Sequence, residues 1–181
     1  MADGPDSPVP TRPLDKVEQE FVDLWRGMSS LWGISPTMAQ IHGFLFISGE
    51  SLSMDDIMER LGISRGNVSM NLTRLLEWGL VRRVHRRGDR RDYYEALGDV
   101  WEMFTLVAAQ RKRREIDPML ATLRGCEEQL AAQPDGARVA DQRRRVGELV
   151  QFLSLMDVLA QRFFESHKSL RNALEILSKD E

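Results

Sequence analysis

A very short connection between two amphipathic segments is the feature that most limits the fold of this chain. Residues 54–61 and residues 64–78 both carry apolar side chains at helical spacing, and only Gly62-Ile63 separates them. Ser53 is placed to cap the first helix, the glycine to end it, and Ser64 to cap the second. Two helices joined so closely are typical of a helix-turn-helix.

A β-hairpin is predicted directly after this pair. Residues 80–85 and residues 91–96 have strand character and flank a Gly88-Asp89 turn. Two further helices are predicted upstream, at residues 14–32 and residues 36–48. Helix, helix, helix and hairpin is the order of a winged helix. We therefore expect a mainly α fold: a winged helix-turn-helix with a small β-hairpin wing and long N- and C-terminal dimerisation helices.

After residue 98 the chain is predicted to be almost wholly helical. Apolar residues recur there along one long helix, mostly in alternating steps of four and three, at Leu149, Leu153, Met156, Ala160, Phe163, Leu170, Leu174 and Leu177. A seam of this length on an otherwise polar helix needs a partner helix. We expect the partner to be a second copy of the chain in a homodimer, with an internal partner as the alternative.

Positive charge is concentrated around the predicted hairpin, although the whole chain has a formal net charge of −3. Residues 79–94 read GLVRRVHRRGDRRDYY, with six arginines. Residues 64–94 carry eight arginines against Glu77, Asp89 and Asp92, a local net charge of +5. The planar guanidinium suits phosphates and narrow grooves, which favours a nucleic-acid surface over a merely solvated face.

The helix at residues 64–78 and the hairpin at residues 84–93 therefore predict binding to double-stranded DNA, with the helix in the major groove and the wing at the minor groove. Asn67 is suited to pairing with adenine, and Arg65 with guanine or phosphate. Gly66 is expected to let the backbone approach the DNA closely. The residues expected at the DNA are Ser64, Arg65, Gly66, Asn67, Ser69, Met70, Thr73, Arg74, Arg86, Arg87, Asp89, Arg90 and Arg91.

The run ISRGNVSMNLTRLLEWGLVRRVHRRGDRRDYYEA resembles the MarR superfamily of winged-helix repressors and is most similar to its GbsR-type (glycine betaine synthesis repressor-like) branch. The words GNVSMNL, LLEWGLV and GDRRDYYEA carry the likeness. It implies a homodimeric repressor whose recognition helices read a palindromic operator while the wings enter the flanking minor grooves. In the family's Asp-x-Arg wing motif the aspartate steadies the arginine, and this motif falls on Asp89 and Arg91. Additional arginines at the tip leave open which of them enters the groove.

The same resemblance implies a small effector such as choline or a related osmolyte precursor. Phe21 and four further aromatic residues can surround a quaternary ammonium by cation–π contact. The ligand-binding candidates are Trp25, Trp32, Trp101 and Phe104. The alternative is that aromatic residues at this helical spacing simply form the core.

These observations divide the chain into three parts. They are a disordered tail at residues 1–13, a winged-helix DNA-binding domain with an N-terminal helix at residues 14–98, and a helical dimerisation and possible effector region at residues 99–181. The chain has a single cysteine, Cys126, and no apolar run long enough to span a membrane. We expect a cytoplasmic protein without membrane contact.

Two enzyme-like signals carry little weight. Residues 62–66 fit the G-x-S-x-G pattern of a hydrolase nucleophile, but that turn needs a preceding strand and a helix is predicted there. His42, His85, His167 and Cys126 show no metal-ligand spacing. We therefore expect no enzyme, cofactor or metal. The remaining alternative is a winged-helix protein-interaction module whose hairpin binds an acidic protein partner.

Overall fold

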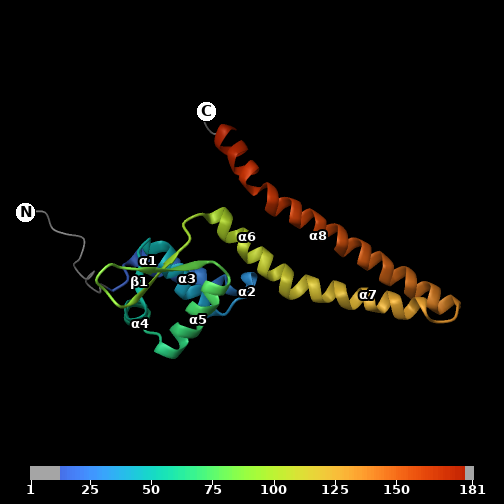
Figure 1. Ribbon diagram of the computed structural model, residues 1–181, viewed down its shortest axis with the longest axis horizontal. Helices are drawn as coiled ribbons and strands as arrows, with labels where there is room; N and C mark the ends of the chain where they lie inside the picture. Colours follow the sequence, from blue (N-terminus) through green and yellow to red (C-terminus); the bar gives the residue numbers. More distant parts are fainter. Residues whose placement is uncertain (1–12, 178–181) are drawn as a thin grey trace, which may run out of the picture. The chain divides into compact units, whose positions relative to one another are not determined.

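The computed structural model describes the backbone of residues 13–177 and the side chains of residues 13–162. The predicted tail thus lies almost wholly outside the described residues. The chain forms two compact units, one ending at Val107 and the other beginning at Ala108 (Figure 1).

The first unit is a bundle of helices with a small sheet. Its sheet is antiparallel and three-stranded, with β3 in the centre between β1 and β2. Val84 of β2 pairs with Tyr93 of β3, and Leu52 of β1 pairs with Tyr94 of β3. The elements in chain order are α1 (Lys16–Gly27), α2 (Ser29–Trp32), α3 (Pro36–Ser48), β1 (Leu52–Ser53), α4 (Met54–Leu61), α5 (Arg65–Glu77), β2 (Val81–His85), β3 (Asp92–Ala96) and α6 (Val100–Arg111). The predicted winged helix-turn-helix is confirmed.

Side-chain caps explain where these helices begin. The Ser35 hydroxyl accepts a hydrogen bond from the backbone N–H of Met38 and starts α3. Ser53 and Asp56 form a reciprocal capping box at the start of α4. Gly62 ends α4 with φ +64, a conformation that favours glycine, and this sharp turn lets α5 begin almost at once.

The prediction of a single continuous helix over residues 14–32 is wrong, because the structure has two helices there. The chain breaks at Met28, so that α1 ends at Gly27 and the short α2 begins at Ser29. The break allows the ring of Trp32 to pack edge-on against that of Trp25, with centroids 4.8 Å apart, where Trp32 is almost wholly buried. Tertiary packing therefore overrides the continuous helical pattern.

One hydrophobic core holds this unit together. It is formed by buried side chains from α1 to α6, the sheet and the turn before β2: Val22, Trp32, Met38, Ile41, Phe44, Leu45, Leu52, Ile57, Val68, Leu72, Leu75, Leu80, Val81, Tyr94, Met103 and Val107. Since Met103 and Val107 are buried in it, α6 is anchored in the first unit.

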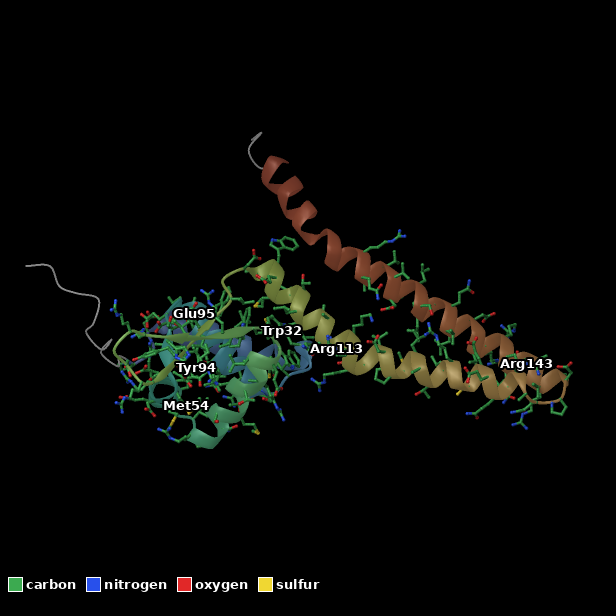
Figure 2. The ribbon with its side chains drawn as sticks, in the orientation of Figure 1. Trp32, Met54, Tyr94, Glu95, Arg113 and Arg143 are labelled. Atoms are coloured by element: carbon green, nitrogen blue, oxygen red, sulfur yellow. The ribbon has the colours of Figure 1, made fainter. Side chains whose placement is uncertain are left out.

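The second unit is a helical hairpin. It contains the π-helical turn η1 (Lys112–Ile116), α7 (Asp117–Ala131) and the long α8 (Ala137–Leu177). Pro118 lacks an N–H, so a regular helix cannot bond it to the preceding turn, and the wider π turn occurs directly before it. Arg143 of α8 donates hydrogen bonds to the carbonyls of Leu130 and Gln133 and thereby caps the end of α7 (Figure 2).

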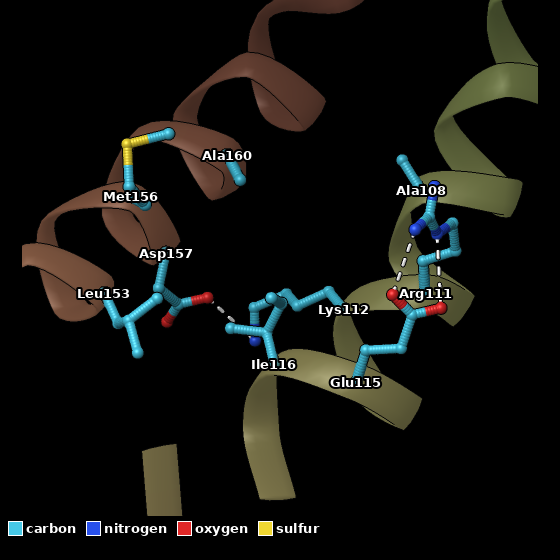
Figure 3. A pocket seen from close by; sticks show the side chains of 9 residues that line it. All are labelled: Ala108, Arg111, Lys112, Glu115, Ile116, Leu153, Met156, Asp157 and Ala160. Atoms are coloured by element: carbon cyan, nitrogen blue, oxygen red, sulfur yellow. Dashed lines mark hydrogen bonds and ion pairs between the residues drawn. The ribbon is translucent and has the colours of Figure 1, made fainter. Parts of the chain in front are cut away.

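Part of the predicted apolar seam on α8 lines a cavity in the second unit. Leu153, Met156 and Ala160 line a cavity of about 340 Å³ opposite Ile116 (Figure 3). Met156 is nevertheless 47% exposed, and the other exposed large apolar side chains in the described part of α8 are Leu149, Phe152, Leu155, Val158 and Leu159. The side chains of Phe163, Leu170, Leu174 and Leu177 lie outside the described residues. Within residues 13–177, no helix is both long enough and apolar enough to span a bilayer.

Candidate nucleic-acid interface

The helix α5 has one buried face and one open face. Val68, Leu72 and Leu75 are at most 1% exposed and fix α5 on the core. Every α5 residue expected at the DNA lies on the open side, with Ser64 just before it: Ser64, Arg65, Gly66, Asn67, Ser69, Met70, Thr73 and Arg74 are all exposed. The start of α5, where short and polar side chains gather, is therefore free to approach a groove.

Two details at the start of α5 differ from a simple capped helix. Ser64 has the extended backbone of an N-cap residue, yet its hydroxyl makes no capping bond to a described N–H group. Arg65 forms an exposed ion pair with Asp55 of α4. This pair joins the two helices of the helix-turn-helix on the solvent side.

Asn71 is a buried polar residue of α5 that the sequence patterns did not single out. It is 1% exposed. Its Oδ1 accepts from the hydroxyl of Ser35 at 3.1 Å, and its Nδ2 donates to the carbonyl and to Oδ1 of Asn67 at 2.8 and 3.1 Å. Asn71 therefore links the cap of α3 to Asn67. The sequence signal that could have identified Asn71 is its position as a polar residue on the apolar face of the predicted helix.

The wing tip is a tight turn between β2 and β3. The N–H of Asp89 donates to the carbonyl of Arg86 at 3.2 Å, and Gly88 has φ +88. A positive φ at this third position of a turn requires glycine or a similarly permissive residue. The turn carries four arginines, which we call the wing-tip arginines: Arg86, Arg87, Arg90 and Arg91.

Asp89 is the centre of a hydrogen-bond cluster in the wing. Its Oδ2 accepts from Nε and Nη2 of Arg91, at 2.9 and 2.7 Å, and from the hydroxyl of Tyr93 at 2.7 Å. These bonds, above all those from Arg91, hold the pKa of Asp89 well below its usual range, so the carboxylate stays charged. The bond that Tyr93 donates to Asp89 raises the pKa of the Tyr93 phenol.

Tyr93 was not among the predicted site residues. Its position was nonetheless readable, because residues two apart on a strand share a face, as Arg91 and Tyr93 do. The guanidinium of Arg86 lies 3.9 Å from the Tyr93 ring centroid and donates to the carbonyl of Ser51 at 2.7 Å. The wing is thus tied both to itself and to the chain just before β1.

Other arginines of the hairpin form ion pairs between β2 and β3. Arg83 lies 3.3 Å from Asp92, and Arg82 bonds to Glu95. Arg87 and Arg90 are exposed, and their side chains bond to no other group among the described residues. The exposed positive charge of the wing is therefore greatest at its tip.

The aromatic residues considered as a ligand site pack against one another in the first unit. The ring of Trp25 stacks on Phe21, and Trp32 contacts both Trp25 and Phe104, at centroid distances of 4.8 and 5.3 Å. Trp101 is 39% exposed, and no ring contact joins it to the others within the described residues. The faces of Trp25 are occupied by neighbouring rings, as expected of a core cluster.

His42 lies in the same cluster and is fully buried. Its Nδ1 accepts from the indole N–H of Trp25 at 3.0 Å. Burial lowers the pKa of His42 to about 4, so the ring is neutral at physiological pH. Among residues 13–162, no group of three or more histidine, cysteine or acidic side chains is arranged to hold a metal ion.

Two further features are the cavity of the second unit, as a possible binding site, and the G-x-S-x-G pattern at residues 62–66, as a possible catalytic motif. The cavity in the second unit has an apolar wall, with Lys112 bonded to Asp157 at 2.9 Å and Arg111 to Glu115 at 3.0 Å at its edge (Figure 3). In the first unit, Ser64 follows the helix α4 rather than a strand. The G-x-S-x-G pattern therefore does not form the strand-turn-helix that a hydrolase nucleophile needs.

The comparison with protein families matches this chain to the MarR family over residues 32–92. The chain is 18% identical over 165 residues to the HTH-type transcriptional repressor OpcR of Bacillus subtilis (strain 168), which covers 87% of this chain and 89% of OpcR. It is 22% identical over 103 residues to the HTH-type transcriptional repressor GbsR of the same organism, 57% of each protein. The chain therefore spans little more than half the length of GbsR.

Among solved structures, the crystal structure of a transcriptional regulator has the same fold. Its TM-score is 0.65 at 20% sequence identity, and the match covers 84% of this chain and 99% of that one. The matched family segment runs from the end of α2 to the start of β3, and contains the helix-turn-helix and the wing tip. The resemblance expected from the sequence is confirmed: residues 32–92 of this chain match the MarR family, and GbsR is among the proteins to which the chain is similar.

Proposed function

We propose that this chain is a sequence-specific DNA-binding transcriptional regulator that acts as a repressor. The observation that carries the proposal is the open polar face of α5 beside a wing whose tip exposes Arg87 and Arg90. In this proposal the N-terminal half of α5 enters the major groove and the wing lies at the minor groove. The names of OpcR and GbsR, both repressors, support the direction of regulation.

The active form in this proposal is a homodimer on a palindromic operator in the cytoplasm. Support comes from the row of exposed apolar side chains on α8, including Phe152 at 58% and Leu159 at 50% exposure. Apolar side chains that recur along one helix are usually covered by another helix. Phe152→Glu with Leu159→Glu is expected to give monomers in sedimentation equilibrium, whereas Gln161→Glu, at an exposed position two residues beyond Leu159 and therefore on another side of α8, should leave the dimer intact.

A small quaternary ammonium compound such as choline is proposed as the effector that relieves repression. Trp101 and Phe104 of α6 are 39% and 47% exposed, so their rings are open to a cation. Titration of choline against tryptophan fluorescence tests this directly. Saturable quenching that Trp101→Leu abolishes would support it, and an unchanged spectrum would exclude choline as a ligand of these rings.

The competing function is a winged-helix module that binds an acidic protein through the hairpin. Salt dependence alone does not separate it from DNA binding, because both depend on arginine. We would titrate the protein onto duplex DNA from upstream of its own coding region and onto scrambled duplex at several salt concentrations. A steep salt slope with about 100-fold preference for the native duplex is the expected result. No binding at low salt would contradict the proposed function and favour the acidic partner.

A further inference from the structure

The side-chain amide of Asn67 has one end turned toward a buried neighbour. Asn67 is exposed near the start of α5, whereas Asn71, one helical turn further along, is 1% exposed. Asn71 Nδ2 lies 2.8 Å from the backbone carbonyl of Asn67 and 3.1 Å from Asn67 Oδ1. Because an amide has a donating nitrogen and an accepting oxygen, the end that faces Asn71 decides which end is left for a ligand.

The hydrogen bonds around Asn71 fix the orientation of both amides. A backbone carbonyl only accepts, so the Asn71 atom 2.8 Å from the carbonyl of Asn67 must be the nitrogen. The other end of the Asn71 amide, Oδ1, accepts from the Ser35 hydroxyl at 3.1 Å. That hydroxyl is held in turn, since it accepts from the N–H of Met38 at the cap of α3. Asn71 Nδ2 therefore faces Asn67, and its second proton needs an acceptor there, which is Asn67 Oδ1.

The end of Asn67 that remains for a ligand is therefore a donor. Its Nδ2 carries two N–H groups, which bond to no other group among the described residues. Turning the Asn67 amide around would set its N–H groups against those of Asn71 and leave a buried donor without an acceptor, which is costly. The network from Ser35 through Asn71 thus keeps the oxygen of Asn67 inward and its nitrogen outward.

We propose, on the basis of the proposed DNA-binding function, that the buried Asn71 is a specificity-determining residue through which Asn67 selects guanine rather than adenine. Adenine pairs with both ends of an asparagine amide, because its N6 donates and its N7 accepts. Guanine offers two acceptors, O6 and N7, and thymine only one, O4, beside a methyl group. A side chain that presents only N–H groups matches guanine best. The residue type at position 67 alone had pointed to adenine.

The base that Asn67 selects is tested by letting the full chain bind duplexes from a random-sequence pool and sequencing the bound fraction. Asn67→Ala is expected to lose the preference at the base pair that Asn67 contacts. At that pair the wild type should prefer guanine over adenine by about five- to a hundredfold, the range of one base-specific contact. A preference for adenine at that pair, or a sequence preference that Asn67→Ala leaves unchanged, would overturn the assignment.

The role of Asn71 is tested by Asn71→Asp, which replaces the donor by a second acceptor. Asn67 must then turn its nitrogen inward, and its outward oxygen should shift the preference from guanine to the bases that donate, adenine and cytosine. Because a buried carboxylate can unfold the chain, Asn71→Leu is a second variant: it releases the Asn67 amide and should bring guanine and adenine to near parity. Leu75→Val, on the same buried face of α5, is the control for destabilisation and should keep the guanine preference.

NMR measures the orientation of the two amides without DNA. The Nδ2 protons of Asn71 should exchange slowly with water and those of Asn67 rapidly, and in Asn71→Asp the Asn67 protons should become slow. A wild type that binds no duplex at low salt would overturn the proposed function and the base choice with it, while these exchange rates still decide the orientation of Asn67. If the wild type binds DNA but the Asn67 protons are the slow ones, or if Asn71→Leu keeps the full guanine preference, Asn71 does not determine specificity.

Discussion

Glu18 of α1 and Arg60 of α4 form a buried ion pair that joins the N-terminal helix to the helix-turn-helix. Arg60 Nη2 lies 3.4 Å from Glu18 Oε2, and the two side chains are 4% and 8% exposed. The guanidinium of Arg60 also lies 3.6 Å from Glu50 and 4.5 Å from the ring centroid of Phe44. Removing one partner would leave a buried charge without its counterpart, which is far more costly than losing a surface pair.

Arg60→Ala is therefore expected to reduce the free energy of unfolding by about 3–5 kcal/mol. Arg65→Ala is the matched control, since its pair with Asp55 also crosses the helix-turn-helix but the side chains are 65% and 58% exposed. An exposed pair of this kind contributes about 0–1 kcal/mol. Urea unfolding followed by circular dichroism measures both, and equal losses would contradict the importance of burial.

The buried His42 predicts a specific pH dependence of stability. Burial lowers the pKa of its ring from 6.5 to about 4, so between these values the unfolded chain binds a proton that the folded chain does not. The free energy of unfolding should therefore fall as the pH decreases through this range, by about 3 kcal/mol in total, and the His42 contribution should level off below pH 4.

Unfolding midpoints between pH 7 and pH 4 test this expectation. His42→Leu should remove the loss of stability in this range, whereas His85→Gln, at an exposed position in β2, should retain it. The pKa values of Asp89 and Glu95 are lowered, so both carboxylates stabilise the fold above their ordinary pKa. That stabilisation is lost as the pH falls from the ordinary carboxyl pKa through the lowered one. A His42→Leu variant with the wild-type pH profile would show that another group titrates here.

Gly43 allows α1 and α3 to pack closely. A Cβ at this position would lie 2.8 Å from atoms of Trp25, so Gly43→Ala is expected to destabilise the protein by about 1–3 kcal/mol through overpacking.

Gly66 in α5 has open space around it, and Gly66→Ala should stabilise the helix by about 0.5–1 kcal/mol. If α5 approaches DNA as proposed, Gly66→Ala should nonetheless weaken DNA binding, which thermal unfolding and anisotropy together would reveal.

Asn71 should matter for stability and Asn67 for DNA binding. Asn71→Ala removes a buried amide and leaves the half-buried Ser35 hydroxyl without its acceptor, so a loss of about 1–3 kcal/mol is expected. Asn67→Ala removes an exposed side chain and should change stability little while weakening operator binding. The reverse pattern in unfolding and DNA titrations would show that Asn67 is not at the interface.

Local patterns in the sequence were enough to predict most elements of the first unit. Capping residues, glycines at helix ends and the short Gly62-Ile63 connection act within a few residues, and the structure places the helix-turn-helix and the hairpin where they indicate. The break at Met28 was not predicted, because it depends on how Trp32 packs against Trp25. Helical periodicity reports the spacing of apolar residues along the chain and not the tertiary contacts that they make.

The sequence by itself determined that arginine is concentrated at a hairpin beside a helix-turn-helix, because spacing and charge are properties of neighbouring residues. Only the tertiary structure decided that Arg86 is held as well, because its guanidinium meets the Ser51 carbonyl across the sheet and the ring of Tyr93. The same holds for the pair of Glu18 and Arg60, 42 residues apart. Such contacts depend on how separate elements pack. Burial of the ion pair in that packing determines how much it contributes to the free energy of unfolding.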